Sequence, residues 1–185
     1  MDAARFTRMD EGTVEDWAII TRHSIDHAGR LADRVLAHLA LLRGDRGGYR
    51  VDRYEHSLQT ATRALRDRAD EETVVCALLH DIGDTLGPWN HSDIAAAALR
   101  PFVSDDNHWL VKHHGIFQGY YFFHFIGQDR NAREKYRGHP MFERTALFCE
   151  RWDQPAFDPS YETLPIDAFE PMVRRLFDKF PSRPY

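Results

Sequence analysis

The sequence lacks the features that define several large classes of protein. Cysteine is scarce: only Cys76 and Cys149 occur among 185 residues, both in apolar stretches that are typical of buried free thiols. No apolar run is long enough to cross a bilayer, and the first residues lack the apolar centre of a signal peptide. We therefore expect a cytoplasmic protein with no membrane association.

Basic clusters, repeats and linkers are missing too. The net charge is −5 at pH 7, and the Lys and Arg residues are dispersed among Asp and Glu, so nothing predicts a nucleic-acid partner. No repeat, low-complexity stretch or Pro/Ser-rich linker divides the chain. The hydrophobic content of 43% is enough for a core. We expect residues 1–185 to form a single domain.

Apolar residues recur at helical spacing over almost the whole chain. The clearest stripe lies in residues 24–43 and is ended by Gly44, Gly47 and Gly48. The sequence contains no run that alternates like a strand, so it predicts a compact all-α fold. Helices are expected at residues 24–43, 54–69, 71–82, 105–114, 117–126, 141–152 and 165–180, with one more beginning at Asn90 as its N-cap.

Histidine is the abundant residue that calls for an explanation, with eleven copies. An apolar helix ends in His80-Asp81, followed by Ile82 and Gly83. His offers a neutral nitrogen to a metal, and Asp offers two oxygens that can bridge two cations. On its own, this pair is equally well explained as the polar end of a helix.

Other metal-capable residues lie near the ends of neighbouring predicted helices. His56 lies near a helix start, His91 follows a Gly-Pro turn, and His113-His114 precede a glycine. Asp153 adds a late carboxylate. Their joint occurrence on successive helices predicts a metal centre.

This order of residues resembles the HD-domain superfamily, from about Tyr49 to Asp153. The resemblance is closest to the diiron HD oxygenases, the group of myo-inositol oxygenase and of enzymes that cleave 1-hydroxyphosphonates. Residues 55–59 (Glu-His-Ser-Leu-Gln) and 78–83 (Leu-Leu-His-Asp-Ile-Gly) are similar to the first two motifs of the phosphonate enzymes. Residues 113–117 and 148–153 are similar to the C-terminal half of myo-inositol oxygenase.

The resemblance implies an HD-type helical bundle with two metals, in which His80 and Asp81 form the catalytic centre and Asp81 bridges the ions. It implies six ligands, namely His56, His80, Asp81, His91, His114 and Asp153. His56, His80 and Asp153 would serve one metal, and His91 and His114 the other. His113 competes with His114, but adjacent helical residues point about 100° apart, so one metal takes only one of them. We choose His114, which directly precedes the glycine.

The function implied by the resemblance is that of a mixed-valent diiron oxygenase. It would use two iron ions (Fe2+/Fe3+) and dioxygen to cleave a small hydroxylated metabolite, such as a polyol or a 1-hydroxyphosphonate-like compound. The alternative is an HD phosphohydrolase that uses Mn or Mg on a nucleotide or phosphomonoester. A third reading is a catalytically idle metal-binding domain. The second pair of histidines, His91 and His114, favours the oxygenase.

Substrate contacts are expected from five residues, namely Tyr49, Asp84, Gln118, Tyr121 and Arg151. Where phosphonate oxygenases carry basic side chains, this chain has Asp84, Gln118 and Glu150. Such an acidic rim would disfavour a doubly charged anion and would suit a polyol or a trimethylammonium compound. The aromatic residues of 117–125 would either enclose such a cation or belong to the core.

Overall fold

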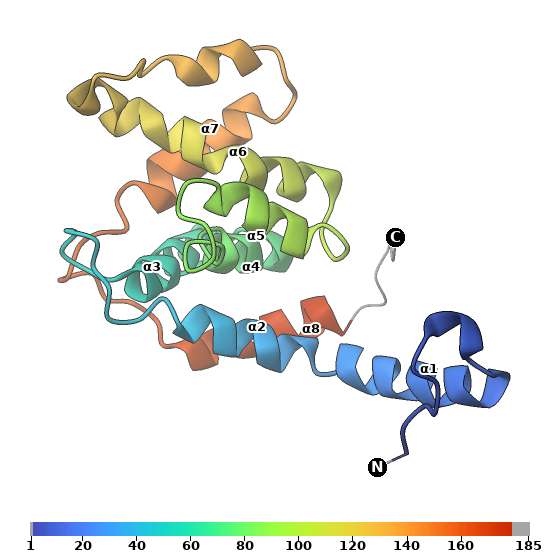
Figure 1. Cartoon of the computed structure of the whole chain (residues 1–185). Helices are drawn as coiled ribbons and strands as arrows, with labels where there is room; N and C mark the ends of the chain where they lie inside the picture. Colours follow the sequence, from blue (N-terminus) through green and yellow to red (C-terminus); the bar gives the residue numbers. More distant parts are fainter. Residues whose placement is uncertain (1, 179–185) are drawn as a thin grey trace.

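The computed structural model describes residues 2–178, and within them every regular element is helical (Figure 1). The all-α prediction is confirmed. The α-helices are α1 (Val14–Ala28), α2 (Leu31–Ala40), α3 (Arg53–Arg66), α4 (Glu71–Leu79), α5 (His91–Leu99), α6 (Asp105–Phe122), α7 (Phe142–Phe148) and α8 (Glu170–Phe177). The short helices are η1 (Met9–Glu11), η2 (Phe123–Ile126), η3 (Ala132–Tyr136), η4 (Cys149–Asp153) and η5 (Ile166–Ala168).

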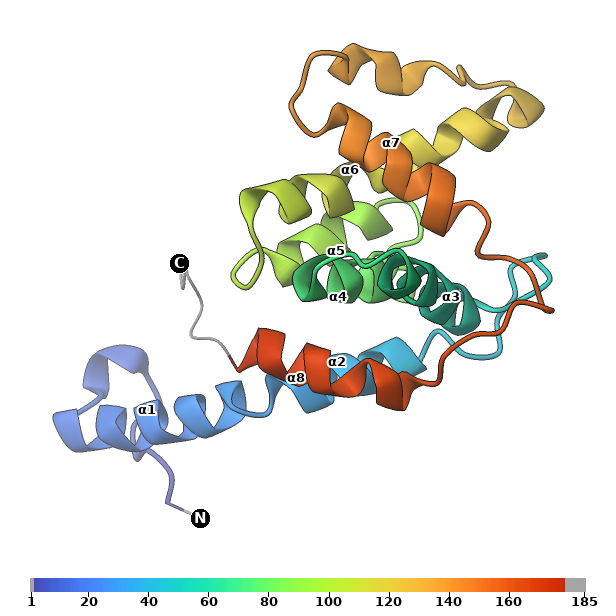
Figure 2. The ribbon, with the colours of Figure 1, turned by 180° about the vertical axis from the view of Figure 1, so that it is seen from behind.

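Helix α4 forms the centre of the molecule. Every residue from Thr73 to Leu79 is buried, as expected for a helix that is apolar on all sides. Helices α2 and α8 lie side by side on one side of α3 and α4, and α6 and α7 lie on the other (Figures 1 and 2). Because α4 is enclosed, the residues that follow its last turn open into the interior of the protein.

The N-terminal helices differ from the prediction. Residues 24–43 were expected to form one helix, but the chain breaks at Gly29-Arg30, between α1 and α2. Helix α1 begins earlier, at Val14, where Thr13 and Asp16 form a reciprocal capping box. It projects away from the other helices (Figure 2), so the apolar stripe of residues 24–43 packs only from Leu31 onwards.

Helix α6 is continuous where two helices, 105–114 and 117–126, were expected. Gly115 lies inside α6 and faces α5. A Cβ atom at this position would come within 3.0 Å of the Ser92 Oγ on α5. The glycine therefore allows close packing of α5 against α6 and does not end the helix. Within residues 2–178, no helix combines the length and the apolar character that a membrane span requires.

The remaining boundaries shift modestly. The third expected helix ends at Leu79 instead of residue 82, and Asn90 precedes α5 without a side-chain capping bond. The expected helix at 141–152 becomes α7 followed by the π-helical η4. The last one, 165–180, is divided into η5 and α8, and its residues 179 and 180 lie outside the described residues. Cys76 and Cys149 are free and buried, as expected.

Candidate metal centre

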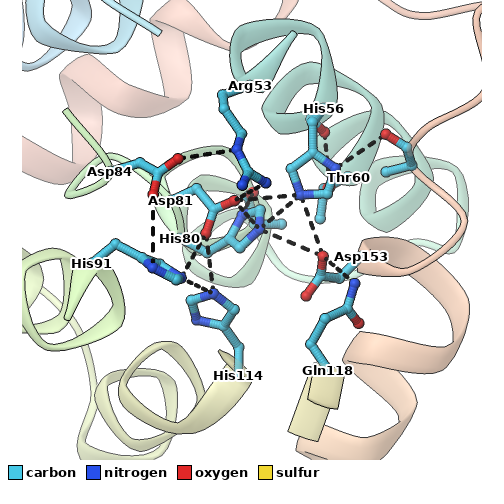
Figure 3. A network of polar contacts seen from close by, with 12 residues as sticks. Arg53, His56, Thr60, His80, Asp81, Asp84, His91, His114, Gln118 and Asp153 are labelled. Atoms are coloured by element: carbon cyan, nitrogen blue, oxygen red, sulfur yellow. Dashed lines mark hydrogen bonds and ion pairs between the residues drawn. The ribbon is translucent and has the colours of Figure 1, made fainter. Parts of the chain in front are cut away.

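Five elements bring the six predicted ligands to one place (Figure 3). His56 comes from the first turn of α3, and His80 and Asp81 follow directly after α4. His91 begins α5 and His114 lies in α6. Asp153 ends η4, and the wider turn of this π-helix follows α7 directly. Single π-helical turns are frequent at functional sites because they redirect one side chain out of the regular helical repeat.

One oxygen of Asp81 faces two of the histidines, and Asp153 faces the same two. The Oδ2 atom lies 3.6 Å from the Nε2 atoms of both His56 and His80. The Asp153 Oδ1 atom lies 3.3 Å from the His56 Nε2 and 3.7 Å from the His80 Nε2. We call the space between His56, His80, Asp153 and the Asp81 Oδ2 the inner position.

The other oxygen of Asp81 faces the remaining two histidines. The Oδ1 atom lies 3.2 Å from the His91 Nε2 and 3.1 Å from the His114 Nε2. We call the space between His91, His114 and the Asp81 Oδ1 the outer position. Asp81 therefore lies between the two positions, with one oxygen directed to each.

Hydrogen bonds on the far side of each ring fix the orientation of all four histidines. The Nδ1 atoms donate to backbone carbonyls, at distances of 3.0 Å for His56, 2.8 Å for His80, 3.1 Å for His91 and 2.7 Å for His114. A proton held on Nδ1 leaves the lone pair of Nε2 free to face the centre. Metal-ligating histidines use this outer hydrogen bond to set their tautomer.

Several hydrogen-bond acceptors lie close together in the centre with few donors among them. The Nε2 atoms of His56 and His80 lie only 3.2 Å apart, and those of His91 and His114 lie 3.3 Å apart. The Asp153 Oδ2 atom is buried without a hydrogen-bond partner among the described residues. Buried acceptors in such close contact need cations to stabilise them, so the donor set fits metal ions.

The pKa shifts of the candidate ligands also indicate a site that favours positive charge. Burial alone would raise the pKa of Asp81, but His80, His114 and His91 hold it well below its usual range. Burial alone would lower the pKa of His80, but Asp81 and Asp153 raise it. The pKa of Asp153 is lowered by its contacts with His56 and His80, against the effect of burial. The carboxylates stay ionised and draw positive charge into this space, as protons or as metal ions.

Comparison with known families agrees with this geometry. A family model described as the HD domain matches residues 53–153, which span all six ligands. The chain belongs to the HD-domain family. No curated protein matches the chain. The family includes metal-dependent enzymes, and the buried cluster of this HD domain could hold metal ions.

His113 and His114 are now distinguished by their surroundings. His114 is buried at the centre, whereas the His113 ring stacks on Trp109 with the ring centroids 4.0 Å apart. The Nδ1 of His113 donates to the Trp109 carbonyl, and burial lowers the pKa of His113. Among these two histidines, only His114 reaches the metal centre.

A cavity of about 250 Å³ opens onto both positions, because His56 and Asp153 line it as well as His91 and His114. Of the predicted substrate contacts, Tyr49, Gln118 and Tyr121 line it. Arg151 lies elsewhere, paired with Asp67 at 2.9 Å and more than half exposed. Asp84 is held by Arg53, with its Oδ2 atom 3.0 Å from the Arg53 Nε, and is not among the lining residues.

The expected acidic rim is therefore wrong. Glu150 is exposed and does not line the cavity, and Asp84 is neutralised by Arg53. Arg53 itself does line the cavity, and the sequence reasoning missed it. A signal was present, because Arg53 directly precedes the helix predicted at 54–69, and one more helical residue at its start places Arg53 on the same face as His56.

The aromatic run from residue 117 to 125 divides between the two roles that were considered. Phe117 is fully buried in the core, while Tyr121 and Phe122 line the cavity. Phe125 is 78% exposed and belongs to neither. A second aromatic wall comes from Tyr49, which stacks on Phe157, which in turn stacks on the ring of His56.

Proposed function

We propose that this HD-domain protein is a mixed-valent diiron oxygenase that cleaves a small hydroxylated metabolite with dioxygen. The observation that carries the proposal is the division of the five other candidate ligands around Asp81. Each carboxylate oxygen faces its own set of imidazole nitrogens, at 3.1–3.6 Å, so one side chain can serve two ions. A set of histidines and carboxylates without thiolate suits iron.

The residues of the chain have separable tasks in this proposal. His56, His80 and Asp153 would hold the inner ion, His91 and His114 the outer ion, and Asp81 both. Bound iron would supply the activation of dioxygen and the removal of hydrogen from a carbon that bears a hydroxyl group. For a vicinal diol, one dioxygen accepts four electrons, the carbon–carbon bond breaks, and the products are an acid, an aldehyde and water.

The cavity limits the substrate. Its volume of about 250 Å³ is below the range of roughly 300–1,000 Å³ that is usual for drug-sized ligands. Tyr49, Tyr121, Phe122 and Phe157 are its aromatic lining residues and would shield a bound substrate from water. A small metabolite fits these walls better than a nucleotide does.

The test is reconstitution with Fe2+ under anaerobic conditions, followed by limited oxidation. We expect about two irons per chain, as a two-metal site requires, and the EPR signal of a coupled Fe2+/Fe3+ pair. Iron that binds at one per chain, or that gives only isolated Fe3+ signals after careful oxidation, would contradict the proposal.

A phosphohydrolase is the second candidate, and Arg53 is the observation in its favour. A guanidinium at the cavity could hold a phosphoryl oxygen beside a metal-bound water. This function predicts turnover of phosphomonoesters by the Mn-loaded protein in the complete absence of oxygen. The same assay with Asp81→Ala as a control separates hydrolysis at this site from a contaminating phosphatase.

A further inference from the structure

A second cavity, with a volume of about 250 Å³, lies at the surface and is lined by none of the candidate metal ligands. Arg63 and Arg66 come from the last turn of α3, and Asp67 follows them. Arg151 comes from η4, and Tyr161 completes the lining. Three of the five side chains are therefore guanidinium groups. Arg151, which the sequence led us to expect among the substrate contacts, belongs to this cavity and not to the one over the metal centre.

The positive charges around this second cavity exceed the negative ones. The Asp67 Oδ2 lies 2.9 Å from the Arg151 Nη2, but it also accepts a hydrogen bond from the Trp152 Nε1 at 2.7 Å. Glu162 approaches Arg66 only to 3.4 Å, and its side chain is 92% exposed, so water screens this pair. Three guanidinium groups thus meet two carboxylates, of which one is shared with an indole and the other is solvated.

Arg63 has hydrogen-bond donors that the protein leaves unused. Its Nη2 atom donates to the Pro155 carbonyl at 2.9 Å, and its Nε atom is buried without a hydrogen-bond partner among the described residues. The Arg63 Cζ lies 3.8 Å from the centroid of the Tyr161 ring, and the Arg66 Cζ lies 5.1 Å from the same centroid. Two like charges three residues apart on a helix repel each other. An anion that contacts both guanidinium groups would offset this repulsion.

The donors of the cavity indicate the kind of anion. A guanidinium group presents a rigid fork of N–H donors that matches the oxygens of a phosphate group, and it stays charged at every physiological pH. Several such forks around one small cavity suit a compact anion with a double negative charge better than a singly charged carboxylate. The three basic residues form one small group and not the long stripe that a nucleic-acid site presents. The cavity therefore suits the phosphoryl group of a small molecule.

We propose that Arg63, Arg66 and Arg151 form a binding site for a phosphoryl dianion that is separate from the metal centre. The site shares α3 and η4 with the inner position, but it shares no lining residue with the cavity over the metals. It does not depend on which reaction the metal centre catalyses. Free phosphate and phosphate monoesters offer the same chemistry to the three guanidinium groups, so both serve as probes.

The test is titration calorimetry of the metal-loaded protein with inorganic phosphate and with methyl phosphate. We expect the double variant Arg66→Gln/Arg151→Gln to bind both probes about tenfold more weakly or worse, because it loses charge-assisted hydrogen bonds. Both side chains are exposed, so their replacement leaves the fold intact, whereas Arg63 is kept because it also holds the Pro155 carbonyl. Arg66→Lys/Arg151→Lys should retain part of the affinity, since it keeps the charge but loses the forks. The probe that binds more tightly identifies the source of the phosphoryl group.

Asp81→Ala separates this site from the metal centre, where bound ions could take up the same probes. Because Asp81 does not line the second cavity, we expect Asp81→Ala to keep the affinity that Arg66→Gln/Arg151→Gln loses. If Asp81→Ala abolished phosphate binding and Arg66→Gln/Arg151→Gln retained it, the anion would belong to the metal centre and the proposed site would be refuted.

Arg174→Gln/Arg175→Gln is the matched control, because it removes the same charge from α8, where the two side chains pair with Asp33 and Glu71. It should leave phosphate binding as in the wild type. Equal affinity in the wild type and in Arg66→Gln/Arg151→Gln would overturn the site. An equal loss of affinity in the two double variants would also overturn it, since that result would indicate a general effect of net charge.

Discussion

The inner and outer positions on the two sides of Asp81 differ in how completely the protein surrounds them. At the inner position, His56, His80 and Asp153 are at most 2% exposed and come from three different elements. At the outer position His91 and His114 are the only described ligands besides Asp81, and the His91 side chain is 26% exposed. A closed ligand set holds a metal firmly, whereas an open one leaves coordination positions for substrate. We expect the outer ion to be the one that meets the substrate.

Asp81→Ala should have the largest effect, because Asp81 is the only ligand that both positions share. We expect metal content to fall to less than about a tenth of the wild-type value, since even outer hydrogen-bond partners of ligands contribute ten- to a hundredfold to metal affinity. Elemental analysis of the purified protein measures this directly. Asp93→Asn, an exposed carboxylate in the first turn of α5, is the control. Full stoichiometry in Asp81→Ala would refute the shared centre.

His91→Ala should separate the two positions. It removes one of two histidines at the outer position and none at the inner one. We expect about half of the wild-type metal content, with the remaining ion bound as tightly as before, since its contacts with His56, His80 and Asp153 are unchanged. Metal titration under anaerobic conditions gives both numbers. Loss of both ions would mean that the positions do not bind independently.

His114→Ala should change metal binding, whereas His113→Ala should change only the stability of the protein. His114→Ala should lose the outer ion, because its Nε2 faces Asp81 at 3.1 Å. His113→Ala should keep both ions but lose roughly 0.5–1.5 kcal/mol of stability, because His113 stacks on Trp109. Urea unfolding and elemental analysis of both variants test the pair. A metal deficit in His113→Ala would reverse the assignment made from their surroundings.

The sequence was sufficient to name the six candidate ligands that the structure brings together (Figure 3), and insufficient for the rest of the cavity. His80-Asp81 could be placed because an apolar helix must be buried, and the residues after its last turn then lie inside. Asp84 and Arg151 were misjudged because position in the sequence does not show which ion pair a charged side chain will form. Gly29-Arg30 and Gly115 were misjudged because a glycine can end a helix or permit close packing, and only the neighbouring helix decides between them.

Gly115→Ala should have the smallest effect and should reach the outer position alone. The new Cβ would come within 3.0 Å of the Ser92 Oγ and 3.9 Å of the His91 Nε2, so α5 must yield by a few tenths of an ångström. Alanine favours the helix by about 1 kcal/mol over glycine, which offsets this crowding and keeps the protein folded. We expect the outer ion to bind a fewfold more weakly in metal titrations and the inner ion to be unaffected. Gly29→Ala, whose Cβ would meet only the α1 backbone at 3.5 Å, should leave both affinities unchanged. If Gly115→Ala weakened the inner ion as well, the close contact between α5 and α6 would support the whole centre and not only its open side.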